Sequence, residues 1–299
     1  MKILLSGSSG LIGSAVARRR AERGDHVVRL VRRESPADPD EIAWDPAGAR
    51  LEASALEGFD AVVHLAGENI AEGRWTAVKK ARIRDSRVEG TRLLAEALAR
   101  CSQPPRALVA ASAIGFYGDR GDEELDETSA PGAGFLAEVC RAWEAAAEPA
   151  IDGGIRVVHL RIGMVLSADG GALAKMMPLF RAGLGGRLGH GRQSMSWIAI
   201  DDLVEAVGHA IAHEGCAGPV NAVAPQPVTN RQFTQTLARV LRRPAWFPAP
   251  AFALRILLGE MADELLLASA RVYPRRLEAQ GFVFGHPDLE GALRSLLRP

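Results

Sequence analysis

The segment GSSGLIG at residues 7–13 constrains the fold most, because its three glycines lie between an apolar run and a helical pattern. A strand-to-helix turn of this kind brings a diphosphate to the free N–H groups of the helix, where the helix dipole favours an anion. A side chain at Gly7 or Gly10 would block that approach, and one at Gly13 would push the helix off the strand. The spacing predicts a dinucleotide site, and the alternative is an ordinary glycine-rich turn.

The rest of the chain alternates apolar strands with helical patterns. The predicted strands are 2–6, 26–31, 60–65, the run ALVAASA after Pro104–Pro105, and 156–166. The predicted helices are 12–23, 76–100 and 133–148, and a Pro-rich loop covers 34–55. Near-continuous apolar strands between helices indicate a parallel sheet covered on both faces. The pattern predicts an α/β fold with a Rossmann-type doubly wound parallel sheet.

The alternation of strands and helices ends at about residue 165. A Gly-rich loop at 183–191 follows, and then helical segments that Pro-rich stretches connect. We therefore expect a nucleotide-binding Rossmann domain at 1–165 and a smaller, mainly helical substrate lobe at 166–299. Residues 196–213 return to a strand-then-helix pattern and are expected to fold back onto the first domain.

Composition excludes several classes of partner. The formal net charge is zero, which argues against nucleic acid or a membrane surface, since both need a basic excess. The 3 cysteines are widely spaced and give no metal motif, so a reduced cytoplasmic compartment is expected. The sequence shows no signal-peptide pattern and no apolar run long enough to span a bilayer.

The end of the second strand indicates which dinucleotide is bound. An NAD site requires Asp or Glu there for the ribose hydroxyls, whereas this chain has Val31, Arg32 and Arg33. A guanidinium pairs with a 2′-phosphate in a fork geometry, so the arginines favour NADP(H) over NAD(H). Alternatively, the two arginines form a solvated surface pair.

Five segments resemble motifs of the short-chain dehydrogenase/reductase superfamily, on its extended, epimerase-like side. They are GSSGLIG (7–13), HLAG (64–67), SRVEGT (86–91), SAIGFYG (112–118) and WIAIDDL (197–203). Longer stretches resemble an atypical subgroup of NAD(P)-dependent epimerase-family proteins, often described as NADP-dependent oxidoreductases of unknown reaction: LAGENI (65–70), GRQSMSWIAIDD (191–202) and YPRRLEAQGF (273–282). The resemblance covers essentially the whole chain and implies NADP(H) binding by a Rossmann core, with a C-terminal substrate lobe.

The resemblance also implies which residues contact the cofactor. These are Gly7, Ser9, Gly10, Leu11, Ile12, Gly13, Arg32, Arg33, Leu65, Ala66, Gly67, Arg87, Ala111 and Arg161. Arg87 stands at the position of the family's Asn, and Arg161 resembles a segment near the nicotinamide. Either arginine could instead be a surface salt-bridge partner.

The superfamily's chemistry uses a Ser that holds the substrate oxygen and a Tyr that gives or takes its proton. A Lys four residues after the Tyr lowers the pKa of the Tyr and holds the nicotinamide ribose. Ser112 matches the Ser, at the end of a predicted strand. The Tyr and Lys should fall near 135–139, where the chain has Phe135 and Val139 instead. Tyr117 is the best candidate for a substitute proton donor, although a Tyr at this position more commonly packs beside the nicotinamide as a wall.

Other polar and aromatic residues are weaker candidates. Asp119 and Glu138 are weaker substitutes for the missing proton donor, but a charge in a polar loop or on a helix face is usually just solvated. His190 could contact a substrate, but a mobile loop position explains it as well. His64 is expected to be a satisfied core histidine. Arg192 could hold a phosphate or carboxylate, and Trp75 and Trp197 are expected to pack while lining the cleft.

Two functions remain open from the sequence. The first is an NADP(H)-dependent oxidoreductase or epimerase-like enzyme that acts on an unidentified small metabolite. The second is a non-catalytic NADP(H)-binding sensor or regulatory module, which the Phe135/Val139 pair supports. A formed pocket favours the enzyme. Helices 76–100 and 133–148 could pair across a homodimer, as in relatives.

Overall fold

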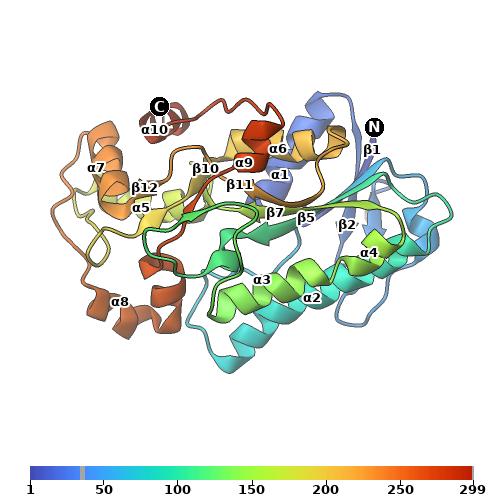
Figure 1. Ribbon diagram of the computed structural model, residues 1–299, viewed down its shortest axis with the longest axis horizontal. Coiled ribbons are helices and arrows are strands. Elements are labelled where there is room, and N and C mark those ends of the chain that lie inside the picture. The colour runs from blue at the N-terminus through green and yellow to red at the C-terminus, as the bar shows by residue number, and fades with distance from the viewer. Residues whose placement is uncertain (34–37, 298–299) are drawn as a thin grey trace.

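The computed structural model describes residues 1–33 and 38–297 and shows helices on both faces of a central sheet (Figure 1). Within these residues, seven parallel strands lie in the order β11-β7-β5-β4-β1-β2-β3. They are β1 (Lys2–Ser6), β2 (His26–Val31), β3 (Glu41–Ala43), β4 (Ala61–His64), β5 (Ala107–Ala113), β7 (Arg156–Ile162) and β11 (Gly218–Ala222). The strand order reverses beside β1, as in a Rossmann fold, so the predicted fold class is confirmed.

Strand alternation divides the apolar core into two layers. Ile3 and Leu5 of β1 belong to the cluster under α1 (Leu11–Glu22) and α6 (Ile200–Ala212). Leu4, between them, belongs to the cluster under α2 (Ala77–Ala99) and α4 (Glu148–Asp152). Because successive side chains point to opposite faces, apolar residues at every position of a strand require helices on both sides.

The helices at residues 171–181, 230–241 and 251–258 lie at one end of the sheet, on the left in Figure 1. The other helices are α3 (Phe135–Ala145), α5 (Gly171–Arg181), α7 (Asn230–Leu241), α8 (Ala251–Leu258), α9 (Arg275–Ala279) and α10 (Leu289–Leu296), with short helical turns η1 (Ala53–Leu56), η2 (Ile114–Tyr117) and η3 (Ala262–Leu267). Short strands are β6 (Glu124–Leu125), β8 (Met164–Leu166), β9 (Ser194–Met195), β10 (Trp197–Ala199), β12 (Val228–Thr229) and β13 (Arg271–Val272). No helix in the described ranges is long and apolar enough to cross a bilayer.

The sheet does not end at residue 165. β11 pairs with β7 and forms the edge strand, and α6 packs against α1, where Glu205 accepts hydrogen bonds from Arg19 and Arg23. Residues 200–222 therefore lie in the layers of the nucleotide-binding core. The predicted loop 34–55 also contains β3, which pairs with β2; its residues 34–37 lie outside the described part of the chain.

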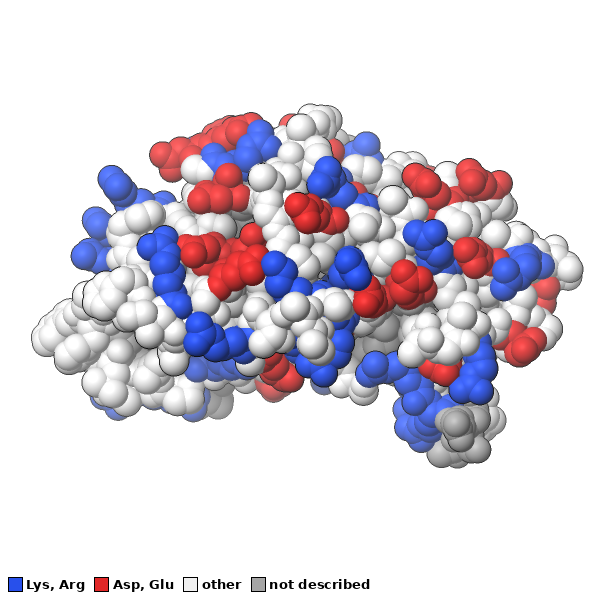
Figure 2. All heavy atoms as spheres, turned by 90° about the horizontal axis from the view of Figure 1, so that it is seen from below, with Lys and Arg blue, Asp and Glu red and all other residues white. Residues whose placement is uncertain are grey.

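Figure 2 shows the face of the molecule that lies below the sheet in Figure 1. Acidic and basic side chains are interspersed over most of this face. Its left end, where α8 lies in Figure 1, carries a broad uncharged area. No residue of α8 is buried, although the helix is mostly apolar. This end of the molecule therefore has an exposed apolar surface, although acidic and basic residues balance in the chain as a whole.

Candidate functional site

The GSSGLIG segment forms the turn between β1 and α1. Gly7 has a φ of +71°, and a Cβ there would lie 2.7 Å from the carbonyl carbon of Leu65. A Cβ on Gly13 would lie 2.1 Å from the carbonyl oxygen of Gly7. At Gly10 the nearest atom would be 3.4 Å away, which is an ordinary contact. The backbone thus requires glycine at positions 7 and 13, whereas Gly10 leaves space from which a ligand can approach the turn.

The N-terminus of α1 is suited to an anion. Gly10 is the N-cap, and no side chain among the described residues caps the helix. The first-turn N–H groups therefore lack intrahelical partners. Ser9 is exposed, and Leu11 and Ile12 are half-buried. A diphosphate at this helix end would meet both the free donors and the positive end of the helix dipole.

Arg32 and Arg33 follow directly after β2, and both are exposed. Arg33 Nη1 lies 3.5 Å from a carboxylate oxygen of Glu41. Arg32 has no hydrogen-bond or ion-pair partner within the described residues. Of the two arginines, Arg32 is therefore the one whose guanidinium is available to a phosphate.

Arg87 lies against the turn that follows β4. Its Nη1 donates to the carbonyl oxygens of Glu68 and Ile83, both at 3.1 Å. A Cβ on Gly67 would lie 3.3 Å from Arg87 Cζ, so the guanidinium contacts the turn formed by Leu65, Ala66 and Gly67. Burial lowers the pKa of Arg87. The side chain is a fixed cation on the side of the sheet that α2 and α3 cover.

Helix α3 should carry the Tyr and the Lys, and its faces decide which residues stand at those positions. Phe135 and Val139 line a cavity of about 750 Å³ against α2. Leu136 and Cys140 instead face η2, since a Cβ on Gly115 would lie 3.2 Å from Leu136 Cβ and 3.8 Å from Cys140 Sγ. Because η2 follows β5 directly, the pair that faces the strand end is Leu136 and Cys140. The expected register is wrong by one residue.

This pair supplies neither a phenol nor an ammonium. Burial raises the pKa of the Cys140 thiol to about 12, so it stays protonated at neutral pH. Phe135 packs edge to face against Trp75 at 5.3 Å between ring centres, and Lys80 Nζ lies 4.5 Å from the centre of the Phe135 ring. Both registers of α3 therefore lack the residues of the usual proton relay.

Ser112 and Arg161 belong to a buried network rather than to an open cleft. The Ser112 hydroxyl donates to Glu144 Oε1 at 2.6 Å. Arg161 donates to the same carboxylate through Nε at 2.9 Å and Nη2 at 2.8 Å, a bidentate pair. Its guanidinium also lies over Phe116, with Cζ 3.4 Å from the ring centre. These contacts hold both side chains inside the protein, and the expected contacts of Ser112 with a substrate and of Arg161 with the cofactor remain predictions.

Tyr117 is fully buried. Its hydroxyl lies 2.7 Å from Asn221 Oδ1 and 2.9 Å from the carbonyl oxygen of Asp126, and it accepts a hydrogen bond from Arg161 at 3.0 Å. Burial raises the pKa of Tyr117. A hydroxyl has one proton, and both acceptors here are internal. These contacts hold the Tyr117 hydroxyl inside the protein, and its role as proton donor to a substrate remains a prediction.

The histidines, tryptophans and charged residues that the sequence suggests as weaker candidates lie partly in the core and partly on the surface. His64 is buried and its Nδ1 lies 2.6 Å from Ser6 Oγ, while its Nε2 has no partner in the described part of the chain. Burial lowers the pKa of His64 to about 4. Trp197 lies in the core, so the expected contact with a cleft is wrong, and Trp75 lines the cavity beside α2. Glu138, His190 and Arg192 are exposed, and Ala111 is buried in β5.

The Asp119 carboxylate binds backbone N–H groups. Its Oδ1 accepts hydrogen bonds from the N–H groups of Gly121 and Ser269. These bonds tie the loop after η2 to the segment before β13. The role of Asp119 as a substitute proton donor remains a prediction.

Sequence reasoning missed Glu144, which joins Ser112 to Arg161. A signal was present, because Glu144 follows Ala137 and Cys140 at spacings of seven and four on the buried face of α3. A carboxylate in that register requires an internal cation.

The fold and the glycine turn define a dinucleotide-binding protein of the short-chain dehydrogenase/reductase type. Residues 3–222 match the family model described as NAD dependent epimerase/dehydratase family, and residues 249–296 match a domain of unknown function. An epimerase family protein of Mycobacterium bovis is 46% identical over 97% of this chain and 96% of its own length. The chain belongs to the NAD dependent epimerase/dehydratase family, in its atypical short-chain dehydrogenase/reductase subgroup.

Solved structures agree with this assignment. The human epimerase family protein SDR39U1, crystallised with NADPH, has a TM-score of 0.91 and 36% identity, and the match covers 99% of each chain. A nucleoside-diphosphate sugar epimerase from Corynebacterium glutamicum has a TM-score of 0.83 and 39% identity, over 99% of this chain and 58% of that one. A nicotinamide dinucleotide is thus the cofactor class of this family.

Proposed function

We propose that the chain binds NADP(H) and acts as an NADP(H)-dependent oxidoreductase or epimerase-like enzyme on a small metabolite, without a Tyr–Lys relay. The observation that carries this proposal is the fixed cation Arg87. Its guanidinium is bonded to the carbonyl oxygens of Glu68 and Ile83 and lies 5.0 Å from the Trp143 ring centre. The Arg87 charge also acts on Cys140, the residue that replaces the family's Lys in the corrected register.

Preference for NADP(H) rests on Arg32. This exposed guanidinium follows β2 and makes no hydrogen bond or ion pair within the described residues, so a 2′-phosphate would gain a charge-assisted pair there. The human relative was crystallised with NADPH. The open space beside Gly10 and the uncapped N-terminus of α1 suit the diphosphate.

When bound, NADPH supplies a hydride, and the chain positions the acceptor. Arg87 would hold the ribose or carboxamide end of the cofactor by hydrogen bonds from its remaining donors. Ser112 and Tyr117 keep their protons inside the Glu144 and Asn221 network. The proton that accompanies hydride transfer therefore comes from solvent or from the substrate itself.

A non-catalytic NADP(H)-binding sensor is the second candidate. The observation that favours it is the pair Leu136 and Cys140, which cannot donate a proton to a carbonyl at neutral pH. In that case the cavity of about 750 Å³ between α2 and α3 would serve a partner rather than a substrate.

A titration of NADPH and NADH against the full chain, followed by nicotinamide fluorescence, tests the cofactor. We expect NADPH to bind more tightly, and Arg32→Ala to weaken NADPH about tenfold while leaving NADH unchanged. Arg18→Ala, an exposed arginine on α1, is the matched control. Tighter binding of NADH would contradict the proposal.

A second experiment separates the enzyme from the sensor. The NADPH-loaded protein is challenged with aldehydes, ketones, quinones and sugars, and absorbance at the nicotinamide band is followed. We expect oxidation that is lost in Arg87→Gln and retained in Tyr117→Phe. Tight NADPH binding with no oxidation of the cofactor by any compound would favour the sensor.

A further inference from the structure

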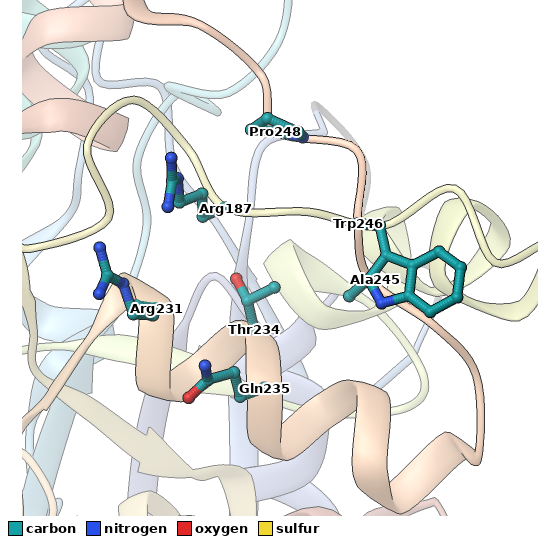
Figure 3. Close-up of a pocket in the computed structure, with 7 residues that line it drawn as sticks. All are labelled: Arg187, Arg231, Thr234, Gln235, Ala245, Trp246 and Pro248. Carbon is teal, nitrogen blue, oxygen red and sulfur yellow. The ribbon is translucent and has the colours of Figure 1, made fainter.

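A second pocket lies in the C-terminal half of the chain, away from the glycine turn. It has a volume of about 330 Å³ and lies between the loop that carries Arg187, the start of α7 and the segment around Trp246 (Figure 3). This volume is at the lower end of the range for small-molecule sites. Neither the predicted cofactor residues nor the Ser112 network contributes to it.

The walls of this pocket are fixed by hydrogen bonds. On one side, Arg231 N donates to the carbonyl oxygen of Gly191 at 2.8 Å, and Leu188 N donates to Asn230 Oδ1 at 2.8 Å. On the other side, Ala249 N donates to the carbonyl oxygen of Arg187 at 2.9 Å. The loop is therefore attached to both neighbouring segments, and the pocket is formed before any ligand arrives.

Two cations line the pocket without a counter-charge. The guanidinium groups of Arg187 and Arg231 lie on the same side of the pocket in Figure 3. Both side chains flank Gly191, whose Cβ would lie 3.1 Å from Arg187 Cδ and 3.5 Å from Arg231 Cβ. Neither has a hydrogen-bond or ion-pair partner within the described residues, and no Asp or Glu of that part of the chain lines the pocket. By contrast, Arg239 on the same helix pairs with Glu290 at 2.5 Å.

The opposite side of the pocket carries Trp246, which is 81% exposed. Burial of a Trp ring normally stabilises a fold, so an indole left in water at a pocket rim is a surface for stacking. Thr234 and Gln235 lie between the ring and the arginines and add a hydroxyl and an amide (Figure 3). The pocket thus combines an anion-binding side with an aromatic side.

We propose that this pocket binds a small aromatic phosphate ester. Two adjacent guanidinium groups match the geometry and the double charge of a terminal phosphate, and they repel each other until an anion neutralises them. The Trp246 indole would stack on the aromatic ring of the same ligand. The site is separate from the proposed NADP(H) site, and its occupancy does not depend on whether the cofactor binds.

Calorimetry with phenyl phosphate, phenol and inorganic phosphate tests the proposal on the full chain, with and without saturating NADPH. We expect phenyl phosphate to bind at least tenfold more tightly than either fragment, and equally well in both conditions. Arg187→Gln and Arg231→Gln should each weaken binding about tenfold or more, and Trp246→Ala should weaken phenyl phosphate but not inorganic phosphate. Arg243→Gln, a nearby exposed arginine outside the pocket, should change neither.

Acrylamide quenching gives a second readout, because Trp246 is exposed and the other tryptophans, Trp44, Trp75, Trp143 and Trp197, are buried. Phenyl phosphate should protect the quenchable fluorescence, and the variants should keep the wild-type circular dichroism. The proposal is overturned if phenyl phosphate does not bind, if NADPH displaces it, or if Arg243→Gln weakens it as much as Arg187→Gln does. Equal affinities for phenyl phosphate and inorganic phosphate would overturn the aromatic half.

Discussion

Substitution Glu144→Ala tests whether the network around Arg161 is an internal ion pair. The variant removes the acceptor of two Arg161 hydrogen bonds, at 2.9 and 2.8 Å, and the acceptor of the Ser112 hydroxyl at 2.6 Å. Arg161 would keep its bond to Tyr117 and its stacking on Phe116, but its charge would lose the opposing carboxylate. Removing one partner of a buried pair costs about 3–5 kcal/mol, because the other charge remains unpaired out of water.

That loss is a large share of the roughly 5–15 kcal/mol by which a domain is stable. We expect urea unfolding, followed by circular dichroism at pH 7, to show it directly. Glu138→Ala is the matched control on the same helix, since Glu138 is exposed and should cost less than about 1 kcal/mol. The double variant Glu144→Leu with Arg161→Met removes both charges and should recover most of the lost stability.

Two results would refute this reasoning. One is a Glu144→Ala variant no less stable than Glu138→Ala, which would mean that water reaches Arg161. The other is a double variant no more stable than Glu144→Ala, which would mean that packing and not charge sets the cost.

Three further predictions concern pH, the glycine turn and a helix cap. The pKa of His64 is lowered from 6.5 to about 4 in the folded chain, so the unfolded chain takes up the proton first as the pH falls. The unfolding free energy should therefore fall by about 2–3 kcal/mol between pH 7 and pH 4.5, and by less in His64→Gln. Equal losses in the wild type and in His64→Gln, measured by urea titration, would contradict this. Gly13→Ala should lower the unfolding free energy by about 1–3 kcal/mol or more, whereas Gly10→Ala should leave stability nearly unchanged and weaken NADPH binding. Glu264→Ala removes a carboxylate that accepts from the first two N–H groups of α3 and should cost about 1 kcal/mol in thermal or urea unfolding.

Periodicity located the long elements of the core well. The predicted helices 12–23 and 76–100 correspond to Leu11–Glu22 and Ala77–Ala99. Gly24 follows the first helix, and Thr76 caps the N-terminus of the second. The predicted helix 133–148 corresponds to α3, which ends at Ala145, and a separate short helix, α4, begins at Glu148 with Pro149 in its first turn. The three-residue strand β3 was missed because its pairing with β2, rather than its own pattern, makes it a strand.

Side-chain direction was harder to predict than the elements. In β5 every residue up to Ser112 is buried, so no polar alternation shows which face the Ser112 hydroxyl takes. The partner of Tyr117 is Asn221, 104 residues away, on a strand that was assigned to the substrate lobe. The one-residue error on α3 has the same cause, since helical spacing defines a stripe but not the element that the stripe faces.

The corrected register changes what the loss of the relay means. In the superfamily the Lys lowers the pKa of the Tyr and holds the nicotinamide ribose. With Leu136 in place of the Tyr, there is no phenol whose pKa could be lowered, and we propose that Arg87 takes over the holding role, since a guanidinium stays charged when buried. The proposal thus separates binding of the cofactor from acid catalysis. Under the proposed function, we expect the best acceptors to be those whose reduced form is stable as an anion, since hydride transfer to them needs no proton from the protein.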